Sequence, residues 1–187
     1  KAEVEAKILA KLGEEAAKVE IEETTLIALD WLNGRRTPYA DQTLKGVIAG
    51  LTLGTTAPKL YRALVEATAF GAKAIVERFR EEGVTIKQVI AIGGIAKKSD
   101  FVMQVTADVF NMPIKVARSE QACALGAGMF GAIAAGVYSG VSKAQSNMSG
   151  GFDKTYLPRP ETIQKYQTLY QKYLDLGKTL EKQLQAL

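Results

Sequence analysis

Apolar and charged residues in the first twenty positions follow a helical repeat. Val4, Ile8 and Leu12 fall on one side of that repeat, with charged residues between them. The pattern predicts an amphipathic helix within residues 1–20 that ends near Gly13 or just beyond. Its apolar side needs a surface to pack against, and we expect an upstream region of a longer chain to contribute to that surface.

Short apolar runs alternate with helical patterns through the middle of the chain. Runs rich in β-branched residues are typical of strands, whereas apolar residues repeated every three or four positions are typical of helices. The predicted strands are 24–31, 86–92 and 114–117, and the predicted helices are 58–83, 99–110 and 122–137. This alternation predicts one α/β domain over residues 21–158, with a partly parallel, mixed sheet and flanking helices.

The last segment, residues 159–187, has the pattern of a long amphipathic helix. Tyr166, Tyr170 and Tyr173 lie at helical spacing, and no proline follows Pro160. We interpret the tyrosines as anchors that hold this helix on the domain. A homodimer interface is the alternative, because tyrosine is also enriched at protein interfaces.

Composition excludes several kinds of partner. The chain has 187 residues, of which 47% are hydrophobic, enough for one buried core. The net charge of +4 is spread along the chain, so no nucleic-acid partner is indicated. Residues 121–142 carry no charge but are rich in Ala and Gly, which predicts a tightly packed buried helix and no membrane span.

The chemistry open to the chain is limited by two residue types. Histidine is absent, which removes histidine general bases and most zinc sites. Cys123 is the single cysteine, so an internal disulfide is excluded and a reducing, cytoplasmic compartment is favoured. We also expect no export, because the N-terminal segment lacks the apolar core and cleavage site of a secretory signal.

The sharpest local feature is the segment Ile92–Ser99, with Gly93 and Gly94 between a predicted strand and a predicted helix. Adjacent glycines remove Cβ atoms where main chain must approach a ligand, and free amides at a helix start favour an anion. An ordinary strand-to-helix turn is the alternative. The segment matches neither GxGxxG nor GxxxxGK[ST], so neither a dinucleotide fold nor a P-loop is supported.

Polar residues after the glycines leave two interpretations open. Lys97 and Lys98 either neutralise a phosphate or form a solvated surface. Ser99 either caps the next helix or contacts a ligand through its hydroxyl, and the cap is the simpler expectation.

Several stretches, taken in order, resemble the C-terminal domain of the FGGY carbohydrate kinases, and most closely the ribulokinase branch of that family. The resemblance runs from about residue 24 into the C-terminal helix, and its order and spacing match throughout. The stretches that carry it are Leu29–Pro38, Leu44–Ile48, Ala67–Ala72, Gly93–Lys98, Met103–Gln104, Ala107–Val109 and Ala122–Ala127.

This resemblance implies an actin-like, ribonuclease H-like ATPase fold of two lobes, with ATP and Mg²⁺ in the cleft between them. This chain would be the second lobe. By resemblance, Gly93 and Gly94 lie against the ribose and α-phosphate, with Ile95, Lys98 and Ser99 near the base. The upstream lobe would hold the pentulose sugar and supply the catalytic base, so neither a catalytic residue nor a metal ligand is expected in this chain, which alone would be inactive.

Other polar residues receive structural interpretations. The resemblance places Asp30 in a structural stretch and not at the catalytic centre. Arg35 and Arg36 either line the cleft or form salt bridges. For Gln104 and Asp108, helix packing and hydrogen bonding is the favoured interpretation.

Two further function classes remain open at this point. One is another FGGY kinase that acts on xylulose or a polyol. The other is an actin-like or chaperone-like ATPase lobe that works with protein partners.

Overall fold

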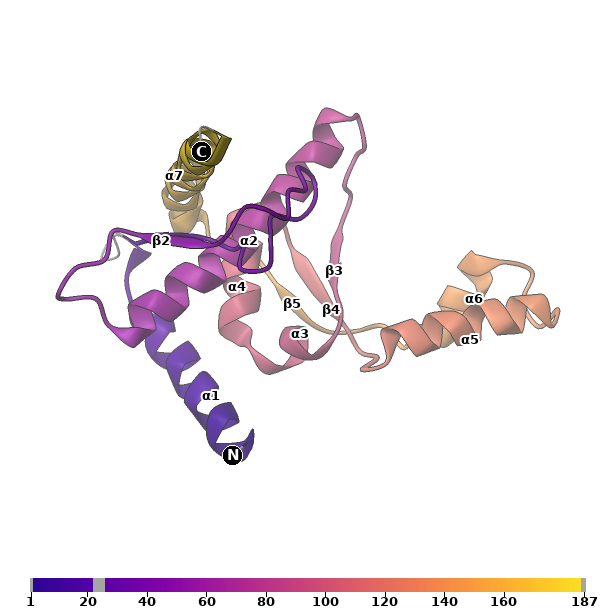
Figure 1. The fold of residues 1–187 in the computed structure, drawn as a ribbon. Helices are drawn as coiled ribbons and strands as arrows, with labels where there is room; N and C mark the ends of the chain where they lie inside the picture. The colour runs from indigo at the N-terminus through magenta and orange to yellow at the C-terminus, as the bar shows by residue number, and fades with distance from the viewer. Residues whose placement is uncertain (1, 22–25, 186–187) are drawn as a thin grey trace.

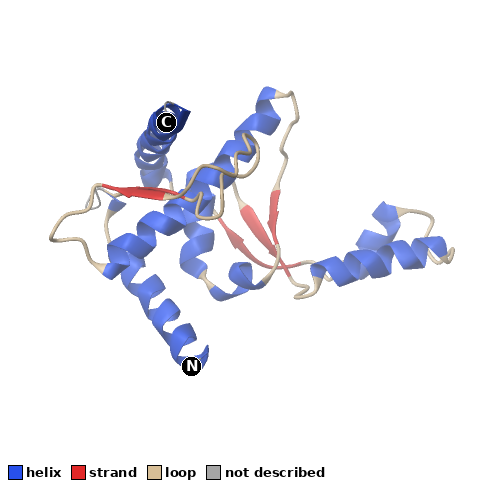
Figure 2. Cartoon of the chain, in the orientation of Figure 1, coloured by secondary structure: helices blue, strands red, loops and turns tan. Residues whose placement is uncertain are grey.

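The computed structural model describes residues 2–21 and 26–185, with side chains from 7 to 21 and from 26 to 183, as a mixed α/β fold (Figures 1 and 2). The side chains of Val4 and Leu184 therefore lie outside the described residues. Along the chain the elements are α1 (Ala2–Lys18), β1 (Ile27–Leu29), β2 (Val47–Ala49), α2 (Ala57–Glu81), β3 (Val89–Ala91), α3 (Gly94–Lys98), α4 (Asp100–Phe110), β4 (Ile114–Ala117), α5 (Ala122–Ala134), α6 (Val141–Met148), β5 (Phe152–Tyr156) and α7 (Pro160–Gln185).

The strands form two small sheets. β3 and β4 are parallel, with Val89 opposite Ile114, and β5 pairs antiparallel with the other edge of β4. β1 and β2 form a separate antiparallel pair. The predicted mixed sheet with a parallel portion is confirmed. Within the described residues β1 and β3 are shorter than predicted, and residues 24 and 25 of the first predicted strand lie outside that part of the chain. Strand β5 was not predicted, because its sequence FDKTY is largely exposed and shows no apolar alternation.

Helix α2 is the centre of the packing. It begins after Thr56, with Pro58 in its first turn, and ends just before Gly83, whose φ is +79°. α1, α4, α7 and β1 all pack against it. The predicted helix 58–83 is confirmed, since proline at the start and a positive-φ glycine at the end are its natural boundaries.

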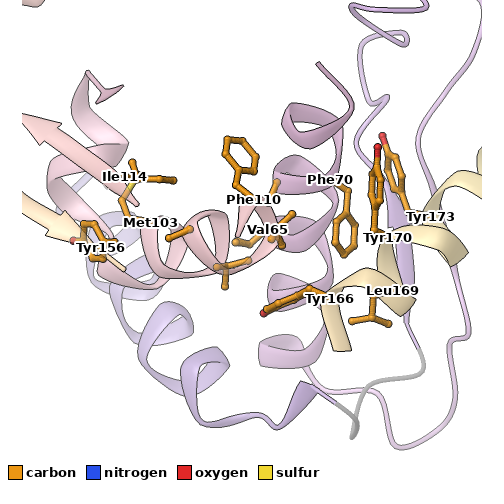
Figure 3. Close-up of a cluster of buried hydrophobic side chains, with 14 of the residues drawn as sticks. Val65, Phe70, Met103, Phe110, Ile114, Tyr156, Tyr166, Leu169, Tyr170 and Tyr173 are labelled. Carbon is orange, nitrogen blue, oxygen red and sulfur yellow. The ribbon is translucent and has the colours of Figure 1, made fainter. Parts of the chain in front are cut away.

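The tyrosines of α7 are anchors, as predicted. Tyr166, Tyr170 and Tyr173 are all at least 93% buried, and Figure 3 shows them beside Phe70 of α2. Ring centroids of Phe70 and Tyr173 are 5.6 Å apart, and those of Tyr170 and Tyr173 are 6.1 Å apart. Burial raises the pKa of all three phenols above the usual value. These side chains are used inside the chain and supply no surface to a second copy.

The helix predicted within residues 1–20 is confirmed, and α1 runs past Gly13, near or just beyond which its end was expected, to Lys18. Glu15 accounts for the extension, because its Oε1 lies 3.0 Å from the Nζ atoms of both Lys11 and Lys18, one turn away in each direction. A single glycine costs a helix about 1 kcal/mol relative to alanine, which such pairs and the packing on α2 offset.

The prediction of a buried helix at 122–137 is wrong. None of the residues of α5 is buried, and α5 and α6 project together from the rest of the structure (Figure 1). Even the large side chain of Phe130 in α5 is 65% exposed, so apolar content did not decide the surroundings of this helix. Within residues 2–21 and 26–185, none of the helices combines the length and the apolar character needed to cross a membrane.

Candidate functional site

The main chain is open at the end of β3. Gly93 has φ +87° and ψ −179°, a conformation that is essentially restricted to glycine. A Cβ atom placed on Gly93 or Gly94 would meet no atom within 4 Å, and both residues are exposed. A flat or charged ligand could therefore approach this backbone closely.

The segment after the glycines differs from the expectation in one respect. A single helical turn, α3, follows Gly93 directly, whereas the expected helix began only at residue 99. The turn continues through residues 95–98 because none of these residues opposes helix formation. Ile95 points outward and is 67% exposed.

Ser99 separates α3 from α4. Its backbone is extended, and its Oγ accepts a hydrogen bond from the Val102 amide at 3.3 Å. The N-cap expectation is confirmed. A contact between the Ser99 hydroxyl and a nucleotide stays a prediction.

The two lysines have different surroundings. Nζ of Lys97 donates to Asp153 Oδ2 at 2.6 Å and to the Arg118 carbonyl at 2.5 Å. Lys98 is exposed, and no partner is recorded for it among the residues that the structure describes. Lys97 is thus engaged inside the chain, whereas Lys98 is exposed to solvent.

Asp153 is the residue of this region that sequence reasoning missed. Besides Lys97, it accepts from Arg118 Nε at 3.1 Å, and the hydrogen bond from Lys97 is the main reason that its pKa lies below the usual value. The cluster ties α3 to the end of β4 and to β5. Asp153 lies 56 positions from Lys97, in a strand without a recognisable pattern, so no local signal marked it.

Gln104 and Asp108 have the structural role that was expected. Asp108 is 1% exposed, and its Oδ2 accepts from Arg159 Nε at 3.0 Å and Nη2 at 2.7 Å. Gln104 Nε2 donates to Asp108 Oδ1 at 2.9 Å. These bonds hold the start of α7 on α4.

Asp30 and Arg35 also act within the fold. Asp30 Oδ1 accepts from the Tyr173 hydroxyl at 2.8 Å, and burial raises the pKa of this carboxyl. Arg35 makes two hydrogen bonds to Glu181, at 3.0 and 3.1 Å, and its guanidinium lies 5.2 Å from the Trp31 ring centroid. The salt-bridge interpretation of Arg35 is confirmed, whereas no partner for Arg36 is recorded in the described part of the chain.

Replacing Gly71 by alanine tests the contact between Asp30 and α2. A Cβ on Gly71 would overlap the Asp30 carboxylate, which cannot move away without breaking its bond to Tyr173. We expect a loss of about 1–3 kcal/mol in the free energy of unfolding, measured by urea denaturation. Gly13→Ala, where a Cβ meets nothing within 4 Å, is the matched control and should be neutral or stabilising.

The site and the fold can be set beside known proteins. Residues 1–135 match the FGGY family of carbohydrate kinases, C-terminal domain. A ribulokinase of Vibrio parahaemolyticus is 49% identical over 179 residues, which are 96% of this chain and 32% of that protein. A ribulokinase of Bacillus licheniformis is 47% identical over 169 residues, 88% of this chain and 31% of that protein.

Solved structures give the same picture. The ligand-bound xylulose kinase from Lactobacillus acidophilus is similar with a TM-score of 0.81 and 28% identity, covering 91% of this chain and 34% of that one. The chain spans about a third of the length of the relatives that it matches.

Proposed function

Because this chain belongs to the FGGY family of carbohydrate kinases, we propose that it forms the adenosine-binding part of an ATP-dependent ribulokinase. The fold agrees with this proposal, since its structural neighbours are sugar kinases with the expected actin-like architecture. The observation that carries the proposal is the likeness to ribulokinases over nearly the whole chain. The exposed Gly93–Gly94 backbone supports the position of the nucleotide.

The proposed reaction transfers the γ-phosphoryl group of ATP to the 5-hydroxyl of L-ribulose or D-ribulose, as in the breakdown of L-arabinose. In this chain, the main chain at Gly93 and Gly94 would receive the ribose and α-phosphate. The exposed side chain of Ile95 would cover the base, with Lys98 and Ser99 beside it. Rigid support comes from the Lys97–Asp153 ion pair, which keeps α3 in place while the nucleotide binds.

Phosphoryl transfer needs more than this chain offers. Mg²⁺ carried by the nucleotide would neutralise charge on the phosphates when bound. Within the described residues, however, no three acidic or cysteine side chains gather into a set that could hold a metal ion. We therefore assign no step to the metal here, and we place the base, the sugar pocket and the remaining phosphate contacts in the rest of the protein. This chain alone should show no kinase activity. We propose that the whole enzyme is cytoplasmic.

The test is the dependence of ATP consumption on sugar in the full-length protein. ADP release should be slow without sugar and should rise strongly with L-ribulose. A preference for xylulose or a polyol would instead assign another FGGY kinase activity. A rate of ATP hydrolysis that no pentulose changes would favour the chaperone-like ATPase.

Lys98 provides a sharper prediction about the nucleotide. Lys98→Ala in the full-length protein should raise the KM for ATP by about threefold to tenfold with little change in kcat, because it removes one charge-assisted contact at an exposed position. Steady-state rates at saturating sugar measure this effect. Lys98→Arg should restore most of the affinity, and an unchanged KM in Lys98→Ala would contradict the assignment.

A further inference from the structure

A cavity of about 540 Å³ lies between the loop that follows β1 and the helices α2 and α7. This volume is typical of sites for small molecules. None of the residues 93–99 lines it, so it is separate from the nucleotide site proposed above.

Part of the lining of the cavity is aromatic and apolar. Trp31, Tyr39 and Tyr173 contribute rings, and Ile75 and Leu174 contribute aliphatic surface. Tyr39 is 56% exposed and is therefore free to meet a ligand, whereas Trp31 is fixed by its contacts with Gly177 and Arg35. Rings of this kind pack against the C–H faces of sugars while their polar atoms remain free to hydrogen-bond.

The polar side chains that line the cavity differ in how far they are already engaged by hydrogen bonds. The Asp30 carboxylate lines it and is engaged by one hydroxyl, that of Tyr173 at 2.8 Å. A carboxylate can accept about four hydrogen bonds, so capacity remains for hydroxyl groups of a ligand.

The charges in the cavity leave an excess of free cations. Arg35 and Glu181 neutralise each other through their paired hydrogen bonds. Arg36 and Lys178 also line the cavity, are exposed, and have no recorded partner among the side chains that the structure describes. A guanidinium and an ammonium that line one cavity suit a phosphate group.

We propose that this cavity is a second ligand site, which binds a phosphorylated sugar. The sugar hydroxyls would bond to Asp30, the C–H face would lie on Tyr39, and the phosphate would pair with Arg36 and Lys178. The site itself is argued from the cavity alone, whereas the choice of a pentulose phosphate as its ligand rests on the proposed function. Two sources share this chemistry, namely the pentulose 5-phosphate that the proposed reaction would make and an unrelated hexose phosphate.

Isothermal titration of the full-length protein tests the site. The catalytic cleft is first saturated with ribulose and a non-hydrolysable ATP analogue, and ribulose 5-phosphate or glucose 6-phosphate is then added. At least one sugar phosphate should bind with one site per chain, and which of them binds more tightly identifies the source.

Two variants make the test specific. The double variant Arg36→Ala and Lys178→Ala should weaken this binding by about tenfold or more, because both phosphate contacts are lost. Lys172→Ala, an exposed lysine of α7 outside the cavity, should leave it unchanged. Kinase activity without added sugar phosphate should be the same in the unmodified protein, the double variant and Lys172→Ala. This result would separate the proposal from the proposed function.

Three outcomes would overturn the proposal. These are absence of binding, equal affinity in the double variant, and equally tight binding of unphosphorylated ribulose or inorganic phosphate.

Discussion

Arg62→Ala is expected to destabilise the protein by about 3–5 kcal/mol, a large share of the roughly 5–15 kcal/mol by which domains are ordinarily stable. Arg62 is 3% exposed, and its Nε donates to Glu66 Oε1 at 2.7 Å. Alanine would leave Glu66, which is 2% exposed, without its countercharge in the core. Burial already raises the pKa of Glu66, and the charge of Arg62 opposes that rise.

The same guanidinium joins three helices. Its Nη1 donates to the carbonyls of Ala16 at 3.1 Å and Val19 at 2.7 Å, at the end of α1, and its Nη2 donates to the Tyr166 hydroxyl of α7 at 2.9 Å. The variant would therefore also loosen α1 and α7 from α2. Urea unfolding followed by circular dichroism measures the loss.

A second arginine of α2 is the control for this experiment. Arg78 pairs with Glu81 and Glu82 at the solvent-exposed end of the helix, so Arg78→Ala should leave the unfolding midpoint almost unchanged. The double variant Arg62→Met and Glu66→Met removes both charges and should cost less than Arg62→Ala alone. If Arg62→Ala were as stable as Arg78→Ala, the network would have no structural role.

Gly93→Val should weaken ATP binding by the full-length protein by about tenfold to a hundredfold. The backbone conformation of Gly93 costs a residue with a side chain about 1–3 kcal/mol, and a branched side chain would also stand where the nucleotide is proposed to lie. Titration with ATP measures the affinity, and thermal melting measures the accompanying loss of stability.

Gly94→Ala separates these two effects. Gly94 is the first residue of α3 and does not have a positive φ, and a Cβ there meets no atom of the chain. Alanine at this position should leave the stability of the fold unchanged. It should weaken ATP binding, because the added methyl group would stand where the nucleotide is proposed to lie. Gly136→Ala, at a φ of +75° far along the chain, is the control for backbone strain alone and should leave ATP affinity unchanged. Normal ATP binding by both Gly93→Val and Gly94→Ala would contradict the proposed position of the nucleotide at this turn.

Much of the fold could be predicted because the signals are local. The spacing of apolar residues and the flanking Pro58 and Gly83 define α2, and Ser99 marks the start of α4. One prediction was wrong because burial depends on residues that are distant in sequence. The segment of α5 did not become buried. Apolar content and low charge were insufficient to decide the surroundings of this helix, in which even Phe130 is 65% exposed.

By itself, the sequence determined the family, the order of the longer helices and of β1, β3 and β4, and the turn at Gly93, since each depends on residues close together in the chain or on a conformation that only glycine adopts readily. It did not show β2, α3, α6 or β5. Tertiary structure alone decided which lysine is free. Lys97 and Lys98 are equivalent in sequence, but Asp153 reaches Lys97 from 56 positions away and leaves Lys98 to solvent. The cavity beside Asp30 is likewise made by segments distant in sequence, because side-chain contacts depend on position in space.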